Sequence, residues 1–490
     1  LDTPEAARAM CGGGDALSDP MLLSGMEAAV ARIHRAIDDG ERIAVFGDYD
    51  VDGVTATALL YTYLDSAGAD VYKLPSRDDD GYGLSETAVD LMAAKGVSLI
   101  VTVDNGVSAN AAIAHAKEQG VDVVVTDHHL PPQTLPEAAA IVNPQLPGDE
   151  SPCKTLSGAG VAFKLAAALD GCTPDEMLPF YGDLAAIGTI ADIMLLEGEN
   201  RRIVKAGLAL LQQTERPGIA ALIEACGLGG KELTAENVSF GLAPRLNAAG
   251  RMDSAAAALE LLLCEDPEEA EAIVAGLEAQ NAARQKAEQD ILQGVLDSVA
   301  ADETYGADRI LVVWGRGYHQ GVIGIVASRV VERFGKPAII VSVDENGEGK
   351  GSGRSIAGVS LYNAIAACGD LLIRFGGHAL AAGLSVREEN LPAFRKAVNA
   401  WAAQEHPVLK RPALRLDAPL ALSGLKEEDV AALSVLAPFG HGNPTPAFFD
   451  RRSISPQRGQ AHAPAPEAGR RSAVCGGVRP GAGRAGLQCG

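Results

Sequence analysis

Short β-branched segments that end abruptly in acidic or imidazole groups recur through the first third of this 490-residue chain. The clearest is Val123-Val-Val-Thr-Asp-His-His129. Runs of this length and composition are typical of buried strands in a parallel sheet. Such a strand would deliver Asp127, His128 and His129 to its carboxyl end, where open α/β sheets bind their ligands. The alternative is a solvated turn that contains two histidines.

Strand-like and helix-like segments alternate in this region, which predicts βαβ units and a largely parallel sheet. We expect strands at residues 42–47, 71–74, 98–103, 121–126 and 138–142, and helices at 19–39, 54–64 and 108–119. Right-handed crossovers would bring all the strand ends to one edge of the sheet. The side chains expected to converge there are Asp48, Asp50, Asp52, Arg77, Asp104, Asp127, His128 and His129.

The remainder predicts a second α/β region behind a helical connection. Residues 157–224 have mostly helical character, 241–252 are expected to form a shaped loop, and 267–300 one long helix. For the second region we expect strands at 310–314 and 338–343 and helices at 321–334, 359–373 and 391–404. The domain boundaries predicted from this order are 1–225, 226–305 for the helical connector, 306–408 for the second α/β domain, 409–450 for the start of an OB-like β domain, and 451–490 for a tail.

The two ends of the chain differ from its middle. The chain begins at Leu1, which suggests that a short N-terminal piece is missing. Residues 451–490 are rich in Gly, Ala, Arg and Pro and contain one acid, Glu467. This low-complexity tail has two interpretations: a disordered basic segment that holds a nucleic-acid strand, or out-of-frame translation of a GC-rich gene. We favour the second, because the change falls where a third domain has barely begun.

The composition limits the class of protein. There is no apolar run of 18 residues and no signal-peptide pattern, and the eight cysteines form no CxxC pair, which predicts a reduced, cytoplasmic protein. The net charge of −23 counts against nucleic acid as a partner at first sight. A local basic groove would escape this sum, and carboxylates gathered around cations would add to it.

Carboxylates gathered on one sheet edge would repel one another unless cations lie between them. Oxygen ligands with one or two imidazoles suit Mn²⁺ or Mg²⁺, and two metals about 3.5–4 Å apart are a standard arrangement for attack on phosphorus. A calcium loop or a capped turn is the alternative for residues 48–53 taken alone. With Asp104 and the Asp-His-His on the same edge, we favour a catalytic site for Mn²⁺ or Mg²⁺, two ions in number.

Several motifs resemble those of the DHH phosphoesterase family and of its companion DHHA1 domain. Three further motifs narrow the resemblance to the RecJ exonuclease family. The DHH-like motifs are Gly47-Asp-Tyr-Asp-Val-Asp-Gly53, Thr102-Val-Asp-Asn-Gly106, Asp127-His-His129 and Gly188-Thr-Ile-Ala-Asp192. Phe375-Gly-Gly-His-Ala-Leu-Ala-Ala-Gly383 is similar to the DHHA1 motif, and the RecJ-like motifs are Leu246-Asn-Ala-Ala-Gly-Arg251, His319-Gln-Gly-Val-Ile-Gly324 and Pro438-Phe-Gly-His-Gly-Asn-Pro444. The likeness runs from about residue 20 to residue 450.

The resemblance implies roles at the matching positions. The metal ligands would be Asp48, Asp50, Asp104, His128 and Asp192, with Asp104 bridging two ions. His129 would bind metal or contact the scissile phosphate, and Asp127 would orient a histidine. Some relatives have a histidine where this chain has Phe46, so that position is either a lost ligand or a plain strand residue. Asp104, Asp127, His128 and His129 are the predicted catalytic group.

The resemblance also implies contacts to nucleic acid. Ser352 and Arg354 would hold a 5′-terminal phosphate with help from Arg77, and Tyr82 would stack on a base. Asn247 and Arg251 would contact the backbone near the cut, and Arg245 more weakly. His378 follows two glycines that allow close approach to a phosphate; its alternative is a core histidine.

The function implied is a single-stranded-DNA-specific 5′→3′ exonuclease of DNA recombination and repair that uses metal-activated water. The alternatives are a small-substrate DHH phosphodiesterase acting on oligoribonucleotides or cyclic dinucleotides, a pyrophosphatase, or a non-catalytic nucleic-acid-binding protein on the same fold. The expected state is a monomer away from membranes. Single-strand-binding protein and a RecQ-type helicase are partners implied by the family alone.

Overall fold

The computed structural model describes residues 16–75, 83–252, 255–406, 408, 414–421, 424–450 and 473–474. The chain divides into two compact units. Unit 1 comprises residues 1–250, 254–274 and 414–490, and unit 2 comprises residues 251–253 and 275–413. Helices and a sheet occur in each unit, so the fold is of the mixed α/β class.

Unit 1 is built on a five-stranded parallel sheet with the order β2-β1-β3-β4-β5. The strands are β1 (Arg42–Gly47), β2 (Asp70–Pro75), β3 (Leu99–Val103), β4 (Asp122–Thr126) and β5 (Ala140–Val142). All five residues of β3 are buried, as are all of β4 after Asp122. Strands covered on both faces must be apolar throughout, which explains the uninterrupted β-branched runs in the sequence.

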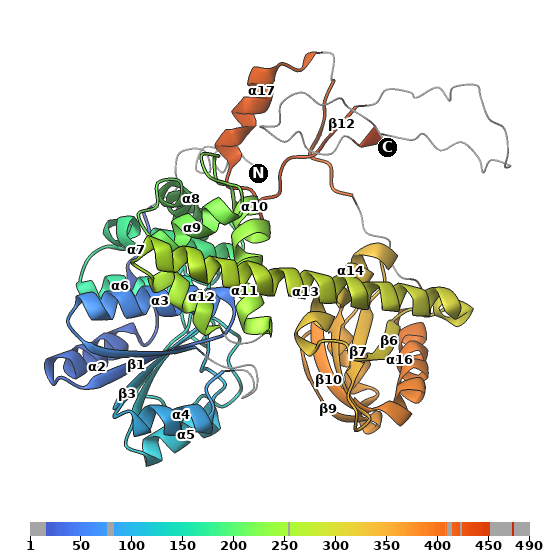
Figure 1. Ribbon diagram of the computed structural model, residues 1–490, viewed down its shortest axis with the longest axis horizontal. Coiled ribbons are helices and arrows are strands. Elements are labelled where there is room, and N and C mark those ends of the chain that lie inside the picture. The colour runs from blue at the N-terminus through green and yellow to red at the C-terminus, as the bar shows by residue number, and fades with distance from the viewer. Residues whose placement is uncertain are drawn as a thin grey trace. The chain divides into compact units, whose positions relative to one another are not determined.

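Helices cover both faces of this sheet (Figure 1). On one face lie α4 (Glu86–Ala94) and α5 (Asn110–Glu118), which share a hydrophobic core with the strands. Phe46 belongs to this core and is 2% exposed. On the other side α3 (Val51–Ser66) and α6 (Gly158–Asp170) pack together.

Further helices complete unit 1. They are α2 (Met26–Asp38), α7 (Pro174–Ala191), α8 (Gly198–Leu211), α9 (Pro217–Ala225), α10 (Ala235–Asn237), α11 (Ala243–Met252) and α12 (Ala256–Leu263). A 3₁₀ turn (Pro20–Leu22) capped by Asp19 precedes α2, and a π-helical turn (Val238–Leu242) precedes α11. The loop expected over 241–252 is therefore wrong, because Leu242, Leu246 and Ala249 bury one helical face there.

Unit 2 holds a second five-stranded sheet, with the order β6-β7-β8-β10-β9. Its strands are β6 (Leu311–Arg316), β7 (Ala338–Val343), β8 (Glu348–Arg354), β9 (Leu372–Gly377) and β10 (Ala381–Arg387). Only β6 and β7 run parallel. The helices are α14 (Gln320–Phe334), α15 (Leu361–Ala366) and α16 (Leu391–Glu405), and α13 (Pro267–Ala301) leads into the unit from unit 1.

The helix expected over 359–373 is wrong in extent. It ends at Ala366, and after a 3₁₀ turn at Gly369–Leu371 the chain enters β9. The described C-terminal part contains α17 (Glu427–Ala432) and three short strands, β11 (Ala418–Pro419), β12 (Phe448–Asp450) and β13 (Ala473–Val474). The OB-like domain stays a prediction. None of the helices in the described part combines the length and hydrophobicity needed to cross a membrane.

Candidate metal centre

Four acidic or imidazole segments meet at the carboxyl edge of the parallel sheet. Asp48 follows β1 and Asp104 follows β3, two neighbouring strands in the order β2-β1-β3. The chain leaves β1 toward β2 on one side and returns to β3 on the other, so this is the point where the strand order reverses. Open α/β sheets bind ligands at such switch points.

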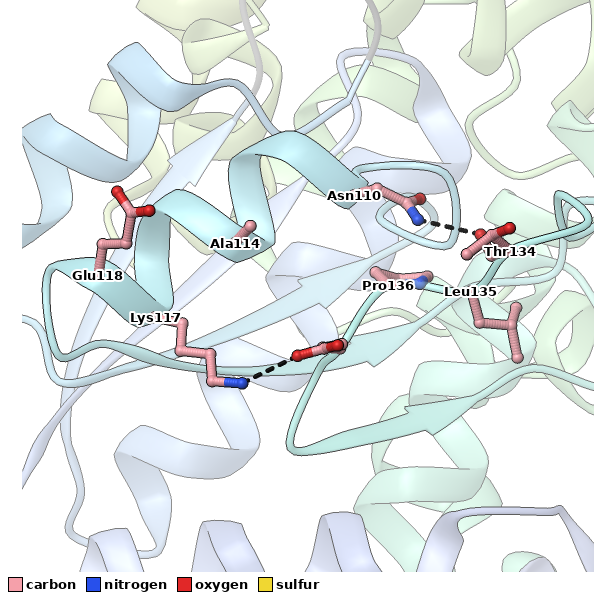
Figure 2. A pocket seen from close by; sticks show the side chains of 8 residues that line it. Asn110, Ala114, Lys117, Glu118, Thr134, Leu135 and Pro136 are labelled. Carbon is pink, nitrogen blue, oxygen red and sulfur yellow. Dashed lines mark hydrogen bonds and ion pairs between the residues drawn. The ribbon is translucent and has the colours of Figure 1, made fainter.

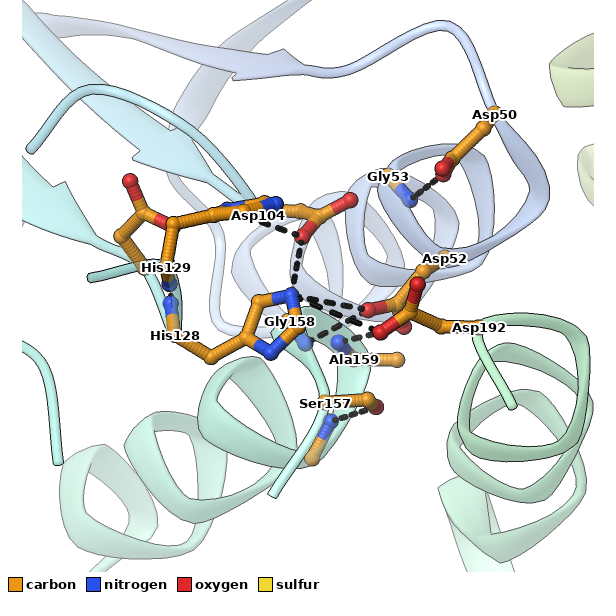
Figure 3. A network of polar contacts seen from close by, with 12 residues as sticks. Asp50, Asp52, Gly53, Asp104, His128, His129, Ser157, Gly158, Ala159 and Asp192 are labelled. Atoms are coloured by element: carbon orange, nitrogen blue, oxygen red, sulfur yellow. Dashed lines mark hydrogen bonds and ion pairs between the residues drawn. The ribbon is translucent and has the colours of Figure 1, made fainter. Parts of the chain in front are cut away.

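Asp104 lies at the centre of the group (Figure 3). It is 2% exposed and has a positive φ of 61°, a conformation that costs a non-glycine residue free energy and is found at functional sites. Its Oδ1 lies 3.1 Å from Nε2 of His128, and that nitrogen lies 3.6 Å from Asp192 Oδ2. Several polar groups therefore point at one small volume.

Two of these atoms are buried without a hydrogen-bond partner in the described part of the chain: Asp104 Oδ1 and His128 Nε2. Burial, together with the charge of His129, lowers the pKa of His128 to about 4, so its ring is neutral at pH 7. Asp104 and His128 thus bring a carboxylate oxygen and an imidazole nitrogen close together, and this pair of donor atoms is suited to a cation.

Ligand atoms in three groups lie within 4.8 Å of one another. The groups are Asp48, Asp50 and Asp104; Asp104, His128 and His129; and Asp52, His128 and Asp192. Asp104 and His128 each belong to two of them. Of these two, only the Asp104 carboxylate has the oxygen lone pairs with which it could bind two ions at once. Carboxylates with one or two imidazoles suit Mn²⁺ or Mg²⁺, and no thiolate lies in these groups. The residues present therefore fit two such ions.

The electrostatics of the cluster also favour cations. Burial, and then the charges of Asp52 and Asp50, raise the pKa of Asp104 well above its usual range. Burial and the charge of Asp50 raise the pKa of Asp192 to about 7. Carboxylates held this close are costly to ionise together unless a cation neutralises them.

Asp127 has a different environment and orients the second histidine. Its Oδ1 accepts hydrogen bonds from the backbone N–H groups of His128 and His129 and lies 2.7 Å from His129 Nδ1; its Oδ2 accepts from Val107 N. Burial alone would lower the pKa of His129, but the bond to Asp127 outweighs it and raises the pKa to about 9. His129 is half exposed, so its Nε2 can meet a ligand from solvent.

Asp52 received no role from the sequence, although it was expected at this edge. Its carboxylate is buried and accepts from the N–H groups of Gly158 (2.6 Å) and Ala159 (2.9 Å), at the first turn of α6. It thereby ties α3 to α6 beside the metal ligands, and its Oδ2 lies 3.9 Å from His128 Nε2. In the sequence, the Ser157-Gly-Ala-Gly160 start of α6, with Ser157 as its N-cap, is the signal from which this contact of Asp52 could have been predicted.

A second cluster, of cationic and hydroxyl groups, lies in unit 2. Arg354 Nη1 donates to Ser352 Oγ (3.2 Å), and burial and the charge of Arg251 lower the pKa of Arg354. Arg251 donates to the carbonyl of Gly321. Across the described residues, no carboxylate forms an ion pair with either arginine. Two adjacent guanidinium groups without a carboxylate form a site for an anion such as phosphate.

The other predicted nucleic-acid contacts have different surroundings, and two lie outside the described residues. Asn247 Oδ1 accepts from Val51 N at the start of α3, and Arg245 donates to Gly241 O. His378 is exposed in the β9–β10 turn, so the alternative of a core histidine is wrong. Arg77 and Tyr82 lie outside the described residues.

A surface pocket beside α5 is a poor candidate for the active site (Figure 2). It lies between α5 and residues 134–137, and its polar contacts are the Lys117–Glu137 ion pair (2.9 Å) and the bond from Asn110 Nδ2 to Thr134 O. Its lining includes none of the three ligand groups. The chemistry therefore belongs to the strand ends.

The metal-free protein is expected to lose stability as the pH rises through about 7, and Mn²⁺ is expected to restore it. The folded-state pKa of Asp192, about 7, is above its unfolded value of about 3.9, so its contribution is present below the unfolded pKa and is lost as pH rises through the folded one. Mn²⁺ at about 100 times its Kd would add about 2.7 kcal/mol, or roughly 3–4 °C in Tm for a unit of this size. Thermal melts at about pH 5.5 and about pH 8 should show the larger Mn²⁺ shift at the higher pH.

The matched variant is Asp192→Asn, which removes the group that titrates near 7. Its metal-free Tm should depend less on pH than that of the unmodified protein. An Mn²⁺ shift of the same size at both pH values would contradict the assignment of this cluster to a metal.

Comparison with known proteins gives matches over most of the chain. The model of the DHH family, N-terminal domain, matches residues 42–189, and that of the DHHA1 domain matches residues 307–404. The single-stranded-DNA-specific exonuclease RecJ of Bacillus subtilis (strain 168) is 42% identical over 461 residues, which are 93% of this chain and 58% of that protein. RecJ of Salmonella typhimurium (strain LT2) is 40% identical over 468 residues, which are 90% of this chain and 80% of that protein.

Solved structures give the same result. The crystal structure of RecJ in complex with Mn²⁺ from Thermus thermophilus has a TM-score of 0.77 at 38% identity, over 87% of this chain and 62% of that one. A crystal structure of exonuclease RecJ bound to manganese has a TM-score of 0.67 at 41% identity, over 78% of this chain and 95% of that one. The chain thus spans less than two thirds of the B. subtilis and T. thermophilus relatives.

Proposed function

The chain belongs to the RecJ family of single-stranded-DNA-specific exonucleases, with DHH and DHHA1 domains, and from this premise we propose that it hydrolyses single-stranded DNA from the 5′ end. The observation that carries the proposal is the buried cluster around Asp104, whose ligand atoms fit two divalent cations. A metal-dependent phosphodiesterase needs this donor set, and a non-catalytic relative would have no use for its electrostatic cost.

We propose Mn²⁺ or Mg²⁺ as the cofactor, held by Asp48, Asp50, Asp104, His128 and Asp192. Bound there, the ions would lower the pKa of a water nucleophile and neutralise charge on the phosphate. His128 is neutral at pH 7, so its Nε2 lone pair would be available to bind a metal ion. His129, held in place by Asp127 and protonated at pH 7, would donate a hydrogen bond to a phosphate oxygen.

The proposed polarity rests on the anion cluster of unit 2. Arg354, Ser352 and Arg251 would bind the terminal 5′-phosphate, because a guanidinium pairs bidentately with phosphate and neither arginine is engaged by a described carboxylate. A site that recognises a terminal 5′-phosphate selects that end of the strand, and we therefore propose cleavage from the 5′ end. Arg77 and Tyr82 remain predicted contacts to the same strand.

Oligonucleotides labelled at either end test the polarity. With Mn²⁺ and a single-stranded 20-mer, 5′ label should be released before 3′ label, and the matching duplex should resist. Arg354→Ala should lower the preference for 5′-phosphate over 5′-hydroxyl substrates by roughly 10–100-fold, since a charged hydrogen bond contributes about 1.5–3 kcal/mol. Release of 3′ label first would overturn the proposal.

Lys396→Ala is the matched control, because it removes a cation from α16 of the same unit without touching the anion cluster. It should leave the end preference unchanged. Preferential turnover of dinucleotides over the 20-mer would instead favour the alternative function, a small-substrate phosphodiesterase. No observation on the described residues favours that alternative over the exonuclease.

The proposal extends to cytoplasmic DNA recombination and repair, the setting implied by the family resemblance. Single-strand-binding protein and a RecQ-type helicase are the proposed protein partners. Co-purification of each with the full chain, in the presence of nuclease to remove bridging DNA, tests these two contacts directly.

A further inference from the structure

The ligand Asp192 stands at the start of an unusual backbone segment. It caps the C-terminus of α7, and the next residue, Ile193, has a φ of 57° although it is β-branched and 65% exposed. A β-branched side chain seldom adopts this conformation unless surrounding contacts impose it. Packing of the Ile193 side chain does not, since that side chain faces solvent. The turn closes through two local bonds, from Ile193 N to the Ile190 carbonyl and from Met194 N to the Thr189 carbonyl, the pair typical of a helix end with a residue in the left-handed region. These bonds leave the Ile193 carbonyl for another donor.

A segment nearly 250 residues away supplies that donor. His441 Nδ1 lies 2.6 Å from the carbonyl oxygen of Ile193. Because a carbonyl oxygen can only accept, the Nδ1–H of His441 donates this hydrogen bond. The carbonyl of His441 in turn accepts from Leu196 N at 2.8 Å. These two bonds bracket the residues directly after Asp192.

Residues 437–443, which include His441, are here called the clamp, and they make further contacts beside this turn. Arg201 donates to the carbonyls of Ala437 (2.7 Å) and Pro438 (3.4 Å). The clamp closes on itself through paired backbone bonds between Gly440 and Asn443. A Cβ on Gly440 would come within 2.7 Å of Leu196 Cδ1, so this glycine lies directly against the Leu196 side chain. Clamp and turn belong to the same compact unit.

We propose that His441 is a positioning residue for the metal centre: by fixing the Ile193 carbonyl it sets the place of the Asp192 carboxylate as a ligand. This inference rests on the proposed metal-dependent function. It also gives a function to the Pro438-Phe-Gly-His-Gly-Asn-Pro444 motif, to which neither the proposed metal site nor the proposed nucleic-acid contacts assign a role. His441 touches neither metal ligand nor substrate itself.

Mn²⁺ binding to the full-length protein, measured by isothermal titration calorimetry without DNA, tests the proposal. Partners that orient ligands typically change metal affinity by about 10–100-fold when removed, so His441→Ala should raise the Mn²⁺ Kd about tenfold or more. His441→Asn should recover most of the affinity, because the asparagine Nδ2–H can take the place of the histidine Nδ1–H. His115→Ala, a surface histidine of α5 paired with Asp90, is the control and should bind Mn²⁺ normally.

A purely structural role would lower Tm but leave the Mn²⁺ Kd unchanged, and that result would overturn the inference. If His441→Ala does not fold, Arg201→Ala decides: a raised Kd supports the clamp, and an unchanged Kd contradicts it. Absence of Mn²⁺ binding by the unmodified protein would instead refute the proposed function. The two failures are therefore distinguishable.

Discussion

Asp104→Ala is expected to lower the rate of phosphodiester cleavage by on the order of 10³-fold or more, because Asp104 belongs to two of the three ligand groups proposed to hold the metal ions. Binding of single-stranded DNA, measured with Ca²⁺ in place of Mn²⁺ to prevent cleavage, should stay close to that of the unmodified protein. The contacts proposed for the terminal phosphate, Arg354, Ser352 and Arg251, lie in unit 2, which does not contain Asp104.

The same substitution should not destabilise the metal-free protein. The raised pKa of Asp104 means that its ionised form disfavours the folded state at neutral and higher pH, so its removal relieves repulsion. The metal-free Tm at about pH 8 should therefore equal or exceed that of the unmodified protein.

Asp90→Ala is the matched control for this experiment. Asp90 is an exposed carboxylate of α4 that pairs with His115, outside the three ligand groups. It should leave cleavage unchanged. Retained cleavage in Asp104→Ala would restore the interpretation of a non-catalytic nucleic-acid-binding protein.

The sequence predicted the first sheet well, because its signals are local. A strand buried on both faces must be apolar along its whole length, and a polar group at its end is then conspicuous. The ends of β1, β3 and β4 could thus be assigned to one edge from the βαβ pattern alone.

Strands β8 to β10 could not be found in the same way. Gly349, Gly351 and Gly353 of β8 carry no side chain that would signal a strand. Their conformation depends on neighbours: a Cβ on Gly351 would come within 2.9 Å of Leu384, and one on Gly353 within 2.5 Å of Leu361. Side chains from β10 and α15 fill the space that the glycines leave, and a local pattern contains no trace of that.

Tertiary contacts also decide α11. Pro244, Asn247 and Gly250 favour a loop by propensity, yet the segment is helical. A Cβ on Gly250 would lie 2.7 Å from the carbonyl of Tyr49, between Asp48 and Asp50, and Asn247 caps α3 at Val51. This helix supports the first metal-ligand segment, a role that depends on residues about 200 positions away and could not be inferred from its own composition.

The last prediction concerns Gly158, which lies against Asp104, the proposed bridging ligand. In Gly158→Ala, the new Cβ would lie 2.4 Å from Asp104 Cβ and 2.6 Å from its Cγ, far inside contact distance. Gly158 also donates its N–H to Asp52, so α6 cannot retreat without losing that bond. Asp104 must therefore move by roughly 1 Å, and a displacement of that size can cost about 10²-fold in rate.

Gly158→Ala should accordingly lower cleavage by about 10²-fold, weaken Mn²⁺ binding in calorimetry, and lower Tm through overpacking of about 1–3 kcal/mol. Gly160→Ala is the control on the same helix, because the atoms nearest to its Cβ would belong to the Leu156 side chain, the first at 3.2 Å. Its N–H bond to Ser157 Oγ survives the change, so cleavage and Mn²⁺ affinity should remain normal. Equal loss of metal affinity in both variants would show that α6 as a whole, rather than the contact between Gly158 and Asp104, governs the site.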